Sequence, residues 1–167
     1  HYLAGESRLA ARSFDEAMAA AASTGKPDLV ARIELVRCAL GTAALDFDAC
    51  AGFAAMASSA TSADRAYAQF LSGRWDGLEA GALPAPYRAV PQGDDTARNR
   101  AIGQIEDPVS RLVAAGALFR AGRLTPAGIE TAVAAASDQG WRRPLLAYLN
   151  VQAQLAERAG DSAALEA

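Results

Sequence analysis

Residues 107–140 read DPVSRLVAAGALFRAGRLTPAGIETAVAAASDQG and carry the signals of two consecutive helices. Asp107-Pro108 and Thr125-Pro126 each place a capping residue directly before a proline, which is typical of a helix start. Gly122 and Gly140 predict where the two helices end. The apolar residues between these signals recur at helical spacing: Val109, Leu112, Val113, Leu118, Ile129 and Val133. The stretch therefore predicts two short helices joined by a tight turn.

Similar start and stop signals recur along the rest of the chain. Ser13-Phe14-Asp15-Glu16 has the pattern of a capping box and predicts the start of a helix. Lys26-Pro27-Asp28 predicts the start of the next helix, and Asp94-Asp95-Thr96 offers caps for a later one. Pro144 lies in the first turn of a predicted long helix. Gly160-Asp161-Ser162 predicts its end and the start of one more helix.

The composition predicts a single all-α domain over residues 1–167. Of the 167 residues, 43 are alanine and only 11 are valine or isoleucine, which favours helix and leaves little material for a sheet. The chain is long enough for one domain with its own core. Residues 83–93 contain prolines and a glycine and predict one long irregular segment.

Charge and hydropathy argue against a nucleic-acid-binding protein and against a membrane-spanning one. The formal net charge is −3, which argues against a nucleic-acid-binding protein with a broad basic surface. The apolar stretches are short and interrupted by charged residues, so we expect no transmembrane segment.

A short pattern recurs with an offset of 33 residues between residues 12–17 and residues 45–50. Both copies place an aromatic residue, Phe14 or Phe47, at a predicted helix start, with a small residue three positions later. Weaker copies occur at residues 73–78, 121–124 and 159–164.

These segments resemble the turn between the two helices of a tetratricopeptide repeat (TPR), whose period is about 34 residues. Lys26-Pro27-Asp28 is similar to the proline-containing turn between successive repeats of that family. The resemblance covers residues 1–57 and 107–167, whereas residues 58–106 depart from it and the signature tryptophan and Leu-Gly pair are missing. It implies antiparallel helical hairpins stacked as a short TPR-like α-solenoid; the alternative is a compact helical bundle.

The two cysteines, Cys38 and Cys50, allow two interpretations. They lie on consecutive predicted helices, and a hairpin turning around Leu45 would bring them to similar heights. A disulfide would then close a short loop and contribute about 3 kcal/mol; the alternative is two buried free thiols.

A disulfide would favour a bacterial periplasmic or outer-membrane-associated location, with a cytoplasmic location as the alternative. The excess of arginine over lysine, 15 to 1, suggests a GC-rich bacterial genome. Because the chain begins at His1, we expect a processed product, in which an upstream signal peptide or lipid anchor would not be visible.

The inventory of reactive side chains is thin. His1 is the only histidine, so a Ser–His or Cys–His mechanism lacks a base and a zinc site is not expected. The sequence contains no phosphate-binding loop of the GxxxxGK form. The acid pairs Asp46/Asp48 and Asp94/Asp95 fit helix caps better than a glycosidase site. We therefore expect no enzyme activity, no metal and no cofactor.

Binding to a protein or peptide partner is the function that this composition favours. A helical array presents a groove, in which exposed aromatic residues and arginines often contact the partner. The candidates are Tyr67, Trp75, Tyr87, Arg88, Trp141, Arg142 and Arg143. The alternatives are that Trp141 seals the core and that Tyr87 anchors the irregular segment.

Two hypotheses follow. The first is a non-catalytic protein-interaction or adaptor domain, in the periplasm or tethered to a membrane of a bacterial envelope. The second is a helical domain that binds a small molecule or a glycan. In that case residues 83–93 would cover a pocket lined by Tyr87 and Trp75.

Overall fold

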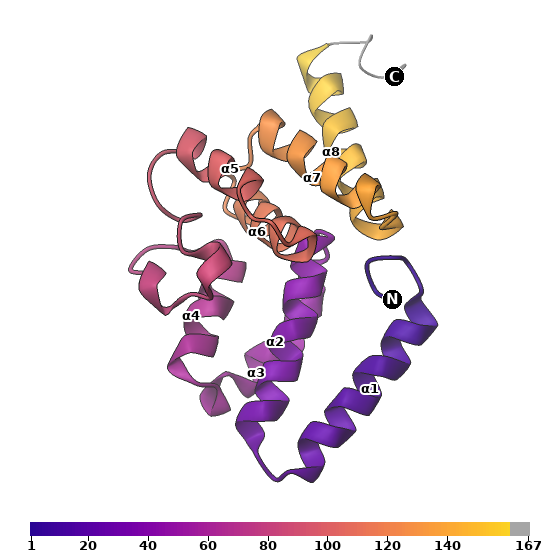
Figure 1. The fold of residues 1–167 in the computed structure, drawn as a ribbon, viewed down its shortest axis with the longest axis vertical. Coiled ribbons are helices and arrows are strands. Elements are labelled where there is room, and N and C mark those ends of the chain that lie inside the picture. Colours follow the sequence, from indigo (N-terminus) through magenta and orange to yellow (C-terminus); the bar gives the residue numbers. More distant parts are fainter. Residues whose placement is uncertain (161–167) are drawn as a thin grey trace.

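The chain is built from helices joined by turns (Figure 1). The computed structural model describes residues 1–160, and this part of the chain contains no strand. In order, its elements are α1 (Ser7–Ser23), α2 (Pro27–Ala43), η1 (Phe47–Cys50), α3 (Ala51–Met56), η2 (Ala57–Ser59), α4 (Ser62–Leu71), η3 (Ala80–Ala82), η4 (Ala85–Tyr87), α5 (Asp95–Gly103), α6 (Pro108–Arg120), α7 (Pro126–Asp138) and α8 (Arg142–Ala159), where η denotes a 3-10 turn. The all-α prediction is confirmed.

Side-chain caps begin three of the helices where the sequence predicts them. Asp94 accepts a hydrogen bond from the backbone N–H of Ala97 at 2.8 Å, which starts α5. Asp107 accepts from the N–H of Ser110 at 2.7 Å, and Thr125 caps α7 in the same way. The hydrogen bonds from Ser110 hold the pKa of Asp107 below its ordinary value. Each of these caps acts within one helical turn, so the local sequence is enough to define the helix start.

The predicted helix start at Ser13 is wrong. α1 begins at Ser7, directly after a left-handed Gly5 (φ 86°), and Ser13 lies inside the helix on an exposed face. Neither glycine nor proline occurs within α1, and the alanines around Ser13 favour continued helix over a cap. The segment at residues 12–17, which resembles a TPR turn, is therefore helical.

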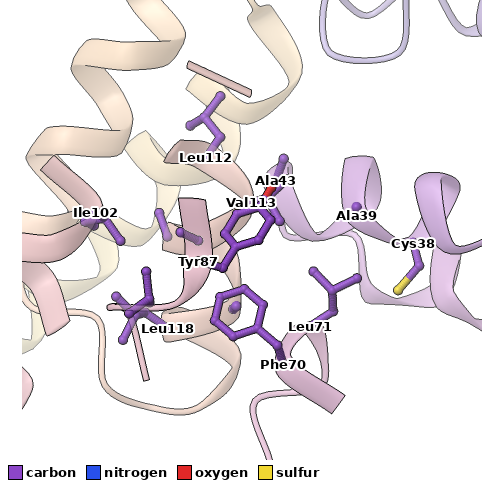
Figure 2. Close-up of a cluster of buried hydrophobic side chains, with 14 of the residues drawn as sticks. Cys38, Ala39, Ala43, Phe70, Leu71, Tyr87, Ile102, Leu112, Val113 and Leu118 are labelled. Atoms are coloured by element: carbon purple, nitrogen blue, oxygen red, sulfur yellow. The ribbon is translucent and has the colours of Figure 1, made fainter. Parts of the chain in front are cut away.

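Helix α6 forms the centre of the core. Residues 112–118 are all buried, which is typical of a helix that has neighbours on every side. It packs against α2, α4, α5 and α7. Figure 2 shows Leu112, Val113 and Leu118 of α6 in one buried cluster with Phe70 and Leu71 of α4 and with Ala39 and Ala43 of α2.

The crossing of α2 and α6 depends on a glycine. A Cβ at Gly116 of α6 would overlap the backbone carbonyl oxygen of Thr42 in the last turn of α2. Thr42 itself is fully buried. The two backbones therefore approach more closely than any other residue at position 116 would allow.

The stacking of the hairpins as a solenoid stays a prediction. α2 packs directly on α6, which is far from it in sequence, whereas the units of a solenoid contact only their neighbours. Residues 83–93 are irregular, as predicted, and contain the single turn η4. Gly160 ends α8 in a left-handed conformation; the helix predicted after Ser162 lies outside the described residues.

The α2–α6 crossing yields a direct prediction. Gly116→Ala forces the two helices apart and should lower the free energy of unfolding by about 2 kcal/mol. Gly103 is the matched control, because it ends α5 with nothing within 4 Å of an added Cβ. Gly103→Ala should be neutral or slightly stabilising. Urea denaturation measures both variants; equal effects at the two positions would contradict the close crossing.

Candidate functional site

An open cavity of about 490 Å³ lies between α1 and α2, which meet near Gly25 and diverge from it (Figure 1). We name it the α1–α2 cleft. Its walls are mostly apolar: Ala10, Phe14 and Ala17 from α1 and Ile33, Val36 and Leu40 from α2. Val36 is 51% exposed, so part of the apolar wall of α2 faces solvent.

Both helices present residues at helical spacing to the cleft. On α1, positions 10, 14 and 17 follow the i, i+4, i+7 pattern, and on α2 positions 33, 36 and 40 follow i, i+3, i+7. Such rows form the ridges that pack against a further helix. The hydrophobic stripe of α2 is therefore divided: Ala31, Leu35 and Ala39 are buried in the core, and the cleft residues lie on a different face.

Two arginines border the cleft. The guanidinium group of Arg37 lies over the ring of Phe14, 4.7 Å from its centroid. That of Arg143 lies 4.4 Å from the centroid of Tyr2. Among residues 1–160, neither arginine forms an ion pair. Asp15 is the one acid in the lining, so the cleft carries an excess of positive charge.

Arg142 and Arg143 hold the N-terminal segment in place. Arg143 donates to the carbonyl oxygen of Tyr2 at 3.0 Å and to the hydroxyl of Ser7 at 2.8 Å. Arg142 donates to the carbonyl oxygen of Ala4 at 3.2 Å. Several of the donors predicted to bind a partner are thus used within the chain, and Arg143 contributes to the cleft through the stacked face of its guanidinium group.

Tyr2 fixes the same segment to the turn after α2. Its hydroxyl donates to Asp46 Oδ2 at 2.7 Å. Burial and this hydrogen bond raise the pKa of Tyr2 to about 12. The neutral phenol is therefore favoured in the folded state, and this contribution to stability is present below pH 10 and lost as the pH rises toward 12.

Three of the predicted binding residues form one aromatic cluster around Phe70. The ring of Tyr67 stacks on that of Tyr87, with centroids 5.2 Å apart, and the ring of Trp75 stacks on Phe70 at 5.6 Å. Trp75 also donates its indole N–H to the carbonyl oxygen of Phe70 at 2.9 Å. Burial raises the pKa of Tyr67 well above its ordinary value. Figure 2 shows the rings of Tyr87 and Phe70 adjacent in the core.

Tyr87 is therefore a core residue, as the alternative interpretation has it, and not an exposed groove residue: it is 6% exposed. Its segment also buries Leu83 and Val90. No residue of the segment 83–93 lines the α1–α2 cleft. Arg88 is exposed and donates to the carbonyl oxygen of Leu83 at 2.9 Å. Trp141 is half-buried and packs against the core, which agrees with its sealing role.

Cys38 and Cys50 form a disulfide, with their sulfur atoms 2.01 Å apart. The predicted pairing is confirmed, and the alternative of two free thiols is wrong. The bond joins the face of α2 beside the core to η1, across a turn in which Leu45 adopts a positive φ of 58°. It therefore fixes the start of α3 against α2.

The site residues missed by the sequence analysis are the cleft residues themselves. Phe14, Ile33, Val36 and Leu40 carry the apolar periodicity of an ordinary core stripe. Nothing in that pattern distinguishes a buried stripe from one left open by two diverging helices. The stacking of Arg37 on Phe14 brings together residues from two helices and has no local signal either.

Two further properties concern the described residues alone. No helix within residues 1–160 has both the length and the hydropathy required to cross a bilayer. In the same part of the chain, no three or more histidine, cysteine, aspartate or glutamate residues gather in a way that could hold a metal ion.

The arginine clamp on the N-terminal segment yields a second prediction. Arg143→Gln should lower the free energy of unfolding by about 1–2 kcal/mol and accelerate amide exchange at residues 2–6. The substitution removes the hydrogen bonds to Tyr2 and Ser7 and the stacking of the guanidinium group on the ring of Tyr2. Arg143→Lys should not restore stability, since an ammonium group lacks the planar fork. Arg142→Gln, which loses one exposed hydrogen bond, should cost less than half as much. Equal effects of the two glutamine variants would contradict the clamp.

The disulfide yields a third prediction. Its two cysteines are 12 residues apart, and a loop of that length corresponds to about 3 kcal/mol of stabilisation. Reduction of the wild-type protein should lower its thermal midpoint clearly. The double variant Cys38→Ala/Cys50→Ala should have a similarly lowered midpoint that no longer responds to reductant. An unchanged midpoint on reduction of the wild type would show that the bond does not constrain the chain.

Comparisons with models of protein families, with curated proteins and with solved structures found no match to this chain. The assignment of a function therefore rests on the geometry of the chain's own residues.

Proposed function

We propose that this chain is a non-catalytic protein-interaction domain and that the α1–α2 cleft binds an amphipathic helix of a protein partner. The observation that carries the proposal is the pair of apolar rows on α1 and α2 that face one another across an open cavity. The TPR-like character of the helical hairpins belongs to the same proposal, since repeat proteins of that kind bind peptides in grooves between helices.

The dimensions of the cleft suit a helix. Its walls belong to two helices of 17 residues each, which are about 25 Å long. A partner helix of three to four turns matches this length and, packed against α1 and α2, would form a three-helix unit in which ridges pack into grooves. Burial of exposed Val36 and the neighbouring apolar atoms supplies the driving force.

The charges at the cleft indicate what the partner carries. Within residues 1–160 neither Arg37 nor Arg143 forms an ion pair, although Arg143 donates hydrogen bonds to Tyr2 and Ser7. Asp15 is the one acid in the lining of the cleft. A partner helix with glutamate or aspartate next to its apolar stripe complements these arginines. An apolar helix without acidic residues gains only the hydrophobic part of the binding free energy and should bind more weakly.

A bacterial envelope location, in the periplasm or bound to a membrane from that side, is part of the proposal. The disulfide is compatible with an oxidising compartment, and the alternative is the cytoplasm. The alternative function, binding of a small molecule or glycan under residues 83–93, has less support, because Leu83, Tyr87 and Val90 fill the core beneath that segment.

A selection experiment tests the proposal and identifies the chemistry of the partner at the same time. Helical peptides displayed on phage are selected against the folded protein, and the enriched peptides are synthesised and titrated by fluorescence anisotropy. We expect an apolar stripe at i, i+3 and i+4 flanked by acidic residues. Val36→Arg should weaken binding at least tenfold, because it places a charge in the apolar wall.

Leu146→Arg is the matched control. Leu146 is 68% exposed on α8 and does not line the cleft, so this substitution adds the same charge elsewhere and should change affinity less than twofold. Circular dichroism confirms that both variants fold. If the selected peptides bind both variants as tightly as the wild type, the cleft is not the docking site.

A further inference from the structure

A second cavity, of about 670 Å³, lies beside the disulfide, and its lining includes both Cys38 and Cys50. We name it the disulfide pocket. Figure 2 shows the sulfur of Cys38 on α2 at the side of the core cluster, away from the rings of Phe70 and Tyr87. The pocket is therefore separate from the aromatic cluster. It shares no lining residue with the α1–α2 cleft.

Three arginines from different elements line the disulfide pocket: Arg65 of α4, Arg74 of the following turn and Arg120 of α6. The lining contains no aspartate or glutamate. The buried carboxylate of Glu34, one helical turn before Cys38 on α2, lies against Gly52 of α3 and does not line the pocket.

The chain orients these guanidinium groups and leaves most of their donors free. Arg120 lies over the ring of Phe47, 4.9 Å from its centroid, and donates to the carbonyl oxygen of Leu71 at 3.5 Å. Arg74 donates from Nε to the hydroxyl of Ser72 at 3.4 Å, and Arg65 donates to the carbonyl oxygen of Ala60. A guanidinium group has five N–H donors, so several remain for a ligand.

Within residues 1–160, the three arginines of the disulfide pocket form no ion pair. Across the described residues, the ion pairs of arginine involve Arg32, Arg98 and Arg123, none of which lines the pocket. The whole chain has a net charge of −3. A concave site lined by three arginines and no acid concentrates positive potential and attracts anions.

The remaining lining is largely apolar and comes from Phe53, Ala54 and Ala57 on one side and Ala68 on the other.

We propose that the disulfide pocket binds an amphiphilic phosphate monoester, whose dianionic head group lies between the arginines and whose short apolar body lies along the alanines. The planar fork of arginine matches the oxygens of phosphate, and two forks can bind one head group. The volume lies within the range of small-molecule sites.

Octyl phosphate, used below its micelle concentration, is the probe, and isothermal titration calorimetry is the measurement. We expect one molecule to bind per chain. Arg74→Gln should weaken binding about tenfold, and Arg74→Gln/Arg120→Gln should weaken it further. Arg100→Gln is the matched control, because Arg100 is exposed on α5 and does not line the pocket; it should change affinity less than twofold.

A second pair of variants keeps the proposal testable if loss of Arg120 impairs folding. Ala54 and Ala55 are both exposed on α3, but only Ala54 lines the pocket. Ala54→Glu places a carboxylate beside the arginines and should abolish binding, whereas Ala55→Glu should leave it within twofold of the wild type.

Three results would overturn the proposal: no binding of octyl phosphate, equal binding by Ala54→Glu and Ala55→Glu, or equal affinity for octyltrimethylammonium. Inorganic phosphate should bind at least tenfold more weakly than octyl phosphate, and equal affinities would refute the apolar half of the site. A second experiment distinguishes a membrane lipid from a soluble ester as the source of the phosphate head group: binding of the protein to phosphatidylcholine vesicles with and without phosphatidic acid. Recruitment by phosphatidic acid identifies a lipid, and its absence identifies a soluble ester.

Discussion

The close contact between Gly116 of α6 and the carbonyl of Thr42 in α2 is the constraint on which the rest of the structure depends. It brings two helices that are distant in sequence into close backbone contact, and α2, α4, α5 and α7 together bury residues 112–118 of α6. α2 is thereby held against α6 by one face. Its other faces remain available for α1, for the disulfide-bound η1 and α3, and for α4.

Both proposed sites follow from the position of α2. One face of α2 forms a wall of the α1–α2 cleft, and Cys38, on another, forms part of the disulfide pocket. The two sites differ in chemistry because different elements complete them. α1 supplies an apolar row to the cleft, whereas α4 and α6 supply Arg65 and Arg120 to the pocket. α2, packed against different elements on its different sides, thus forms part of two separate cavities.

Local signals predicted the all-α class and several helix starts, whereas the candidate sites depend on tertiary geometry. Caps such as Asp107 and Thr125 act within one helical turn, so the sequence alone places them. The same reasoning failed at Ser13, where a capping pattern lies inside an alanine-rich helix that has no reason to break. Arg143 was a candidate for partner binding because of its residue type, but the N-terminal segment folds back onto it, a contact over more than a hundred residues of sequence. The opening between α1 and α2 depends on the angle between the two helices, and the hydrophobic periodicity of the sequence does not predict that angle.

The proposed cleft requires a rigid α2–α6 unit and an α1 that packs mainly on α2 and is therefore held with less support. Native-state hydrogen exchange measures this directly, because it reports the opening free energy of each helix separately. We expect the amides of α2 and α6 to exchange last and together, near the global free energy of unfolding. Those of α1 should exchange at a clearly lower opening free energy, so that the cleft can widen around a partner helix while the core stays closed. If α1 exchanges only with α6, in one global unfolding event, then α1 is a fixed part of the core and the cleft does not open as a binding site.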